Sequence, residues 1–240
     1  MTRLAYAVKE AFLTLQGEGR WAGHRAVFVR FSGCNVWSGQ EKDRARDTVK
    51  GCCAAWCDTD FRGTDGQRGG VYSRADLVAL VVGLWGLPIS QDSPLVRTEG
   101  LLIAGAARAP GEPMVVFTGG EPGLQLDTAL VVAMRAAGMR VHVETNGSVE
   151  LPECIDWACL SPKPPMQVLR RRFDEVKVVY PAVDPAPYSD PSQYLHRYLQ
   201  PMDCLDPDEA ANNKTDCIDY VLAHPEWVLS LQTHKMVGLP

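Results

Sequence analysis

The stretch Met114-Val115-Val116-Phe117-Thr118-Gly119-Gly120-Glu121-Pro122 predicts a buried strand that ends in a tight turn. An unbroken apolar run of this length is typical of a strand covered on both faces, as in a parallel sheet. Proteins of the α/β class place their binding sites at the carboxyl ends of such strands. The adjacent glycines let a ligand approach the backbone closely, and the Glu121 carboxylate suits a charged amino group. On its own, the same turn is also typical of an ordinary connection from strand to helix.

Apolar runs of strand length alternate with helical patterns on both sides of this stretch, which predicts an α/β fold with a mostly parallel sheet, an α/β barrel or part of one. The expected helices are residues 77–84, opened by a capping box at Ser73, and residues 127–137, ended by Gly138. The expected strands are residues 7–13, 27–31, 114–118, 141–144, 157–160, 176–180 and 228–231.

The chain has 240 residues and 46% hydrophobic content, which suits one globular domain over residues 1–240. Two stretches look like insertions because they are longer than ordinary connections. Residues 35–51 are polar and charged, and residues 88–113 are rich in Pro, Gly and Ala without a clear period.

Charge and hydropathy exclude several classes of protein. A net charge of -5, with Arg170-Arg171-Arg172 as the one basic cluster, argues against a nucleic-acid surface. No window approaches the roughly 20 apolar residues that cross a bilayer. The N-terminal residues meet charge before a long apolar run develops, so no secretory signal is expected. We therefore expect a cytoplasmic protein whose eight cysteines serve metal binding or catalysis more than disulfides.

Cys34, Cys53 and Cys57 look like the ligands of an iron-sulfur cluster. Three thiolates on one loop satisfy three irons of a 4Fe-4S cluster and leave the fourth iron open to another molecule. A closed structural site needs a fourth protein ligand. Cys52 is adjacent to Cys53, so it is an alternative ligand, or the fourth ligand of a closed site.

Together, the cysteines and the Gly-Gly-Glu-Pro turn resemble the radical S-adenosylmethionine (SAM) superfamily. Further motifs, in order along nearly the whole chain, are similar to the 7-carboxy-7-deazaguanine synthase family within it. They are Gln16-Gly17-Glu18-Gly19, Arg30-Phe31-Ser32-Gly33-Cys34-Asn35, Cys57-Asp58-Thr59-Asp60, Glu144-Thr145-Asn146-Gly147, Ser161-Pro162-Lys163, Gln200-Pro201-Met202 and Gln232-Thr233-His234-Lys235. The resemblance implies a partial (β/α)6-type barrel with an embedded 4Fe-4S loop.

The cysteine spacing departs from the short CxxxCxxC spacing usual in the superfamily. Residues 35–52 separate Cys34 from Cys53, and Ala54-Ala55-Trp56 separate Cys53 from Cys57. A long first gap is similar to a variant within the same synthase family. We favour Cys53 over Cys52 because it lies nearer the usual short spacing to Cys57.

The resemblance implies a carbon-nitrogen lyase that converts 6-carboxy-5,6,7,8-tetrahydropterin to 7-carboxy-7-deazaguanine with loss of ammonia, in 7-deazapurine (queuosine-type) biosynthesis. It also implies a 4Fe-4S cluster, SAM and Mg2+ as cofactors, a one-electron reductant such as flavodoxin or ferredoxin, and a homodimer.

Site residues are carried over motif by motif. For the pterin substrate the resemblance implies Gln16, Glu18, Arg30, Thr118, His234, placed at the end of the last strand, and the terminal Pro240. For SAM it implies Asp58, Gly119, Gly120, Glu121, Glu144, Asn146, Ser161, Lys163 and Gln200. For Mg2+ it implies Thr59. Arg30 is also well suited to the substrate carboxylate on chemical grounds, because its planar fork matches that group.

Two other interpretations compete with this one. A different radical SAM enzyme, such as one that activates a partner protein, would usually carry a second cysteine set. A non-catalytic metal-binding module would use Cys52 with the other three thiolates, although adjacent cysteines rarely ligate one metal easily.

Overall fold

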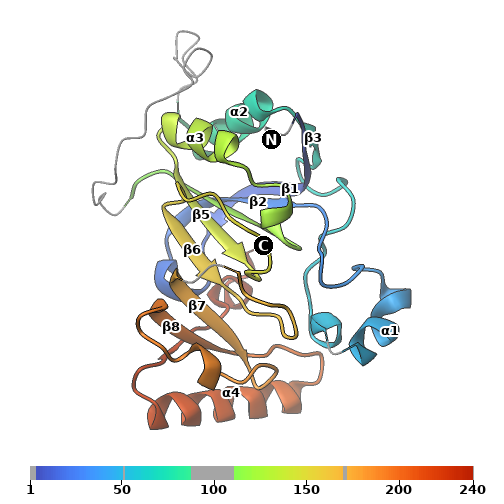
Figure 1. The fold of residues 1–240 in the computed structure, drawn as a ribbon, viewed down its shortest axis with the longest axis vertical. Helices are drawn as coiled ribbons and strands as arrows, with labels where there is room; N and C mark the ends of the chain where they lie inside the picture. The colour runs from blue at the N-terminus through green and yellow to red at the C-terminus, as the bar shows by residue number, and fades with distance from the viewer. Residues whose placement is uncertain (1–3, 51, 88–110, 170–171, 240) are drawn as a thin grey trace.

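The computed structural model describes residues 4–50, 52–87, 111–169 and 172–239, and these form one curved, open α/β layer structure (Figure 1). The described strands make a nine-stranded sheet in the order β3-β1-β2-β4-β5-β6-β7-β8-β9. β1 is antiparallel to β2 and β3, and every pairing from β2 to β9 is parallel. The strands are β1 (Tyr6–Leu15), β2 (Arg25–Phe31), β3 (Gly70–Tyr72), β4 (Met114–Gly119), β5 (Arg140–Thr145), β6 (Trp157–Leu160), β7 (Phe173–Tyr180), β8 (Tyr194–Pro201) and β9 (Val228–Leu229).

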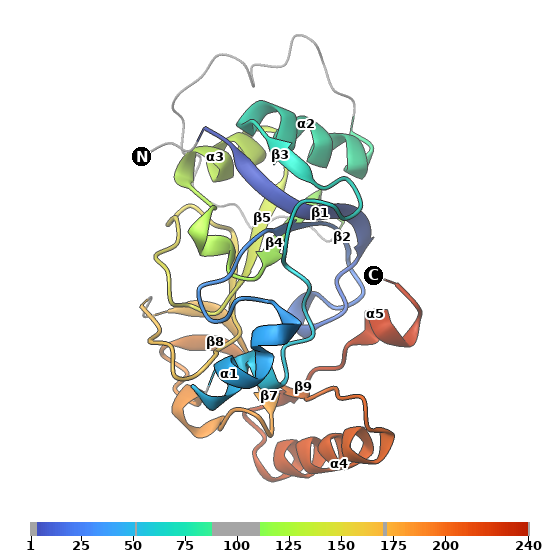
Figure 2. The same cartoon turned by 90° about the vertical axis from the view of Figure 1, so that its right-hand side faces the viewer.

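Helices α2, α3 and α4 cover the outer face of this sheet, whereas α1 lies apart from it (Figures 1 and 2). The helices are α1 (Arg44–Val49), α2 (Arg74–Trp85), α3 (Thr128–Ala136), α4 (Pro207–Ala223) and α5 (Thr233–Met236). α2 packs on β1 and β2, α3 on β5, and α4 on β8 and β9. Alternate strand residues such as Val27, Val29 and Phe31 are fully buried under the helices. Because side chains alternate along a strand, their neighbours face the opposite side.

The parallel register brings the carboxyl ends of the strands to one edge. Arg30 of β2 lies beside Thr118 of β4, and Glu144 of β5 beside Cys159 of β6. Chemically active residues that are far apart in the sequence therefore meet above this edge.

The predicted α/β architecture is confirmed: the sheet is a mostly parallel partial barrel that does not close. All seven expected strands exist, and Ser73 caps α2 by accepting a hydrogen bond from the Asp76 amide. Five of the described helices and strands were missed, and they are β3, β8, α1, α4 and α5.

Residues 41–49 of the first expected insertion form a helical excursion that includes α1. Most of the second expected insertion, residues 88–110, lies outside the described residues. Among the described residues, no helix combines the length and the apolar character needed to cross a bilayer.

Candidate active site

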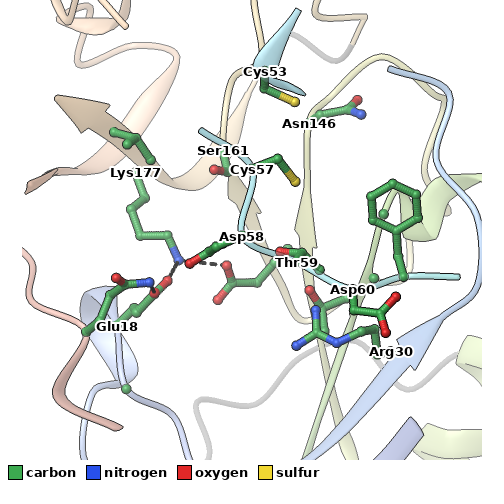
Figure 3. Close-up of a pocket in the computed structure, with 18 of the residues that line it drawn as sticks. Glu18, Arg30, Cys53, Cys57, Asp58, Thr59, Asp60, Asn146, Ser161 and Lys177 are labelled. Carbon is green, nitrogen blue, oxygen red and sulfur yellow. Dashed lines mark hydrogen bonds and ion pairs between the residues drawn. The ribbon is translucent and has the colours of Figure 1, made fainter. Parts of the chain in front are cut away.

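A cavity of about 490 Å3 lies at the carboxyl edge of the sheet and gathers most of the predicted site residues. The predicted residues that line it are Gln16, Glu18, Arg30, Cys34, Cys53, Cys57, Asp58, Thr59, Thr118, Gly119, Gly120, Glu144, Asn146, Ser161, Lys163, Gln200 and His234. The cysteines Cys53 and Cys57 lie together at one end, whereas Glu18 and Arg30 lie toward the other (Figure 3). Pro240 lies outside the described residues, so its predicted approach to the substrate stays a prediction.

The cysteine end has the donor set that a cluster requires. The Val36 amide donates to Cys34 Sγ over 3.4 Å, and amide hydrogen bonds to sulfur are one means by which proteins tune iron-sulfur clusters. A hydrogen bond from the Cys53 thiol, against the effect of burial, lowers the pKa of Cys57 to about 6. Cys57 is thus readily available as the thiolate that binds metal.

Cys52 is arranged differently from its neighbour. Its thiol donates to the Asp47 carbonyl over 2.9 Å, and it does not line the cavity. This geometry favours Cys53 as the ligand.

Among the described residues, no three His, Cys, Asp or Glu side chains surround a point that would suit a single metal ion. A 4Fe-4S cluster is compatible with this, because its thiolates bind separate iron atoms at separate corners.

The helical excursion of residues 41–49, which contains α1, packs against and stabilises the loop that carries Cys53 and Cys57. Arg44 donates to the carbonyls of Ala54 and, over 3.2 Å, of Cys57. Its guanidinium also lies 4.7 Å from the ring centre of Trp37, whose buried indole packs with the cysteines. The long gap between the first two cysteines therefore folds into a support for the loop.

The glycine turn after β4 lies directly against the loop that carries Cys34. A Cβ at Gly120 would come within 2.3 Å of the Gly33 carbonyl oxygen and 2.5 Å of Cys34 Cβ. Only glycine permits this approach. The end of β4 and the first cysteine are consequently held together.

Glu121 does not line the cavity, in contrast to the expectation that its carboxylate contacts SAM. It is fully buried and accepts hydrogen bonds from the Thr145 hydroxyl (2.7 Å), the Asn146 amide (2.7 Å) and the Gly123 amide (2.8 Å). The side chain turns away because these donors satisfy a carboxylate that burial would otherwise destabilise. In this structure Glu121 joins the end of β4 to the end of β5.

An ion bridge connects two predicted ligand contacts across the cavity (Figure 3). Lys177 on β7 donates to Glu18 and, over 2.7 Å, to Glu144 Oε2. The Lys177 ammonium, against the effect of burial, lowers the pKa of Glu18 to about 2. The bridge therefore keeps Glu18 ionised throughout the physiological range.

Glutamine side chains orient the same carboxylates. Gln16 Nε2 donates to Glu144 over 2.9 Å. Gln200 and Gln232 both donate to Glu18 Oε1, over 3.2 and 2.9 Å. Each glutamate thus accepts hydrogen bonds from separate segments of the chain.

Arg30 makes an ion pair with Glu10 of the neighbouring strand, but only through Nε at 2.8 Å. The guanidinium lines the cavity. Arg30 therefore forms an ion pair and also reaches the cavity in which a substrate carboxylate is expected.

His234 lies in the short helix α5 rather than at the end of a strand as expected. The helix forms because Thr233 binds the Gly17 carbonyl through both its amide (3.0 Å) and its hydroxyl (2.9 Å). The His234 ring packs where Gly17 lacks a side chain, since a Cβ there would lie 1.9 Å from Nδ1. The first glycine of the Gln16 motif therefore makes room for His234.

Lys163 and Asp58 line the same cavity as the cysteines. Lys163 donates to the Ser161 hydroxyl over 2.7 Å, and burial lowers its pKa. Asp58 accepts from Lys235 of α5 over 2.9 Å, and Lys235 also reaches Asp203 over 2.7 Å.

Lys177 and Lys235 were not predicted as contributors to the site. The sequence Phe173-Asp174-Glu175-Val176-Lys177 holds a usable signal for Lys177, since alternate charged residues in an apolar strand indicate a polar inner face.

A three-cysteine loop and glycine-rich strand ends that meet around one cavity of a partial α/β barrel define a radical SAM enzyme. No family model matches the chain. Curated relatives are nevertheless similar over nearly the full length.

The 7-carboxy-7-deazaguanine synthases of Caulobacter vibrioides and Bordetella pertussis are 46% and 45% identical, each over 99% of this chain and 100% of the relative. A crystal structure of QueE from Escherichia coli matches with a TM-score of 0.62 and 25% identity, over 95% of this chain and 93% of that one. The chain belongs to the 7-carboxy-7-deazaguanine synthase family.

Proposed function

We propose that this enzyme converts 6-carboxy-5,6,7,8-tetrahydropterin to 7-carboxy-7-deazaguanine with loss of ammonia, as a step of queuosine-type 7-deazapurine biosynthesis. The observation that carries the proposal is the two-ended cavity. Soft thiolates form one end, and ionised or hydrogen-bonding groups that suit a pterin carboxylate and its ring edge line the rest.

Cys34, Cys53 and Cys57 would hold the 4Fe-4S cluster, and its open iron would hold SAM. When bound, the cluster and SAM supply the one-electron chemistry that removes hydrogen from C6 of the substrate. The protein binds and orients the reactants and shields them from water.

The pterin end combines charge with directional hydrogen bonding. Arg30 would bind the substrate carboxylate, Glu18 and Gln16 its donor and acceptor edge, and His234 and Thr118 its flanks. The ionised state of Glu18, maintained by Lys177, lets it accept hydrogen bonds from the pterin amino and ring N–H groups.

The SAM end uses the carboxyl edges of the parallel strands. Glu144 and Asn146 would bind the ribose hydroxyls, Ser161 and Lys163 the carboxylate, and Asp58 with the Gly119-Gly120 turn the amino group. Gln200 would lie near the adenosyl group, and Glu121 would support the site through the backbone of Asn146.

The remaining assignments follow the family. Thr59 lines the cavity and would contribute to an Mg2+ site together with oxygens of the substrate. Residues 1–240 would act as one radical SAM domain with insertions at 35–51 and 88–113. The enzyme would work as a cytoplasmic homodimer and take electrons from flavodoxin or ferredoxin.

The test is product analysis by mass spectrometry after anaerobic cluster reconstitution, with SAM, Mg2+, a reductant and 6-carboxytetrahydropterin. We expect 7-carboxy-7-deazaguanine from the wild type and from Cys154→Ala, a control thiol remote from the cavity, and none from Cys57→Ala. SAM cleavage without a deazapurine would overturn the substrate assignment alone. Absence of both cluster and cleavage would favour a binding module.

The same preparation decides between the adjacent cysteines. We expect Cys53→Ala to lose cluster iron and Cys52→Ala to retain it. The reverse result would assign the ligand to Cys52.

A further inference from the structure

Lys177 occupies an unusual place between the two ends of the cavity. Its side chain is 3% exposed, and its ammonium bonds to two carboxylates that come from different parts of the chain. Glu18 lies in the loop after β1, and Glu144 lies near the carboxyl end of β5. One buried cation thus connects a loop to a strand across the site.

The second oxygen of each carboxylate, Oε1, also accepts hydrogen bonds. Glu18 Oε1 accepts from Gln200 and Gln232, and Glu144 Oε1 accepts from Gln16. Because Gln16 also accepts from the Glu18 amide at 3.2 Å, a second path joins the two glutamates. A shift of either carboxylate is therefore transmitted to the other through Lys177 or Gln16.

Removal of the ammonium would leave the two half-buried carboxylates of Glu18 and Glu144 close together, since both now bond to the same nitrogen. Two neighbouring carboxylates without a cation between them cannot both stay ionised at low cost, so one would take up a proton or move away. Either response changes the position or the hydrogen-bonding character of a group that faces a ligand. A neutral Glu18 would offer an O–H donor where an acceptor now lies.

Another lysine that lines the cavity, Lys163, has a different position. Lys163 donates to Ser161 and lies 4.8 Å from the Trp56 ring, at the cysteine end. Among the described residues, Lys177 is the lysine bonded to both Glu18 and Glu144.

We propose that Lys177 is a positioning residue that couples pterin binding to SAM binding by holding Glu18 and Glu144 in one ion bridge. The inference rests on the proposed function, in which Glu18 binds the pterin and Glu144 binds the ribose of SAM. When one ligand fixes its glutamate, the bridge fixes the other, and the second ligand then binds to a site already in order. Such coupling between two sites is reciprocal by thermodynamic necessity.

The test measures this coupling without turnover. The cluster-reconstituted enzyme, kept anaerobic and without reductant, is titrated with fluorescent 6-carboxypterin, first alone and then with saturating SAM. For the wild type we expect SAM to tighten pterin binding by about tenfold, within the usual range for linked sites. In Lys177→Met the ratio should fall to about one. Lys177→Arg, which keeps a cation between the carboxylates, should retain part of the coupling.

Two controls separate this role from a purely structural one. Lys214→Met removes an exposed lysine from α4 and should leave the ratio unchanged. Thermal unfolding monitored by circular dichroism identifies any variant that has lost its fold, in which case Lys177→Arg carries the test. With reductant added, Lys177→Met should also release more 5′-deoxyadenosine per deazapurine formed, because the two ligands are no longer aligned.

The outcomes separate the two proposals. Wild-type coupling in folded Lys177→Met, with an unchanged product ratio, would refute the role of Lys177 and leave the function standing. Failure of the wild type to bind 6-carboxypterin would refute the proposed function, and the coupling would fall with it.

Discussion

Glu121→Gln should destabilise the protein although it changes a single atom. Glu121 Oε1 accepts from Gly123 and Thr145, and Oε2 accepts from the Asn146 amide. The glutamine oxygen can replace Oε1, but its NH2 group then faces the Asn146 N–H, donor against donor. One charge-assisted hydrogen bond is lost and a buried N–H is left without an acceptor, at a total cost of about 3 kcal/mol.

Thermal unfolding at pH 8 measures this cost. For a chain of this length 3 kcal/mol corresponds to a decrease in Tm of about 6–12 °C. SAM should also bind several-fold more weakly, since Asn146 moves with its amide. Glu150→Gln, at an exposed position four residues after Asn146, is the matched control and should unfold like the wild type. If Glu121→Gln and Glu150→Gln unfold together, the carboxylate does not hold the two strand ends.

Three further predictions concern other parts of the molecule. Gly120→Ala should reduce the iron and sulfide bound after reconstitution, since its Cβ would displace the Gly33-Cys34 backbone; full cluster content would contradict this. Burial, with the charges of Arg140 and His24, lowers the pKa of His142 to about 3. Below pH 6.5 the unfolded state therefore binds a proton at this histidine that the folded state does not bind. Stability is complete above that pH, and about 2 kcal/mol should be lost by pH 5, a loss that urea unfolding should find smaller in His142→Phe. A short tag appended after Pro240 should impair turnover, and unchanged kinetics would remove the terminal residue from the site.

The sequence predicted the strands whose local pattern agrees with their final environment. Residues 114–118 and 157–160 are apolar runs that become parallel strands of the sheet interior, as their composition indicates. β8 was missed because its inner face carries His196, Tyr198 and Gln200, so its sequence lacks a continuous apolar run. α4 was missed for a related reason: only Asn213 and Cys217 are buried along its length, and a mostly polar helix has a weak apolar stripe.

In the candidate site, too, the residues with a local sequence motif could be predicted and the others could not. Cysteines and paired glycines carry short motifs, so their presence in one cavity could be anticipated. The direction of the Glu121 side chain could not, because it depends on donors that β5 supplies only in the folded protein. Lys177 has no motif of its own, and its importance arises from two glutamates that the sheet brings together.

The contact between Glu18 and Gln232 spans 214 residues of the chain, so the site can be completed only late in translation. At a translation rate of 5–20 residues per second, Glu18 waits roughly 10–40 s on the ribosome before its last partner is made. For most of that interval the three cysteines already exist, while the wall formed by β9 and α5 does not. In the nascent chain the cysteine thiols are thus accessible to iron delivery, and to oxygen, from the side that β9 and α5 cover in the folded enzyme.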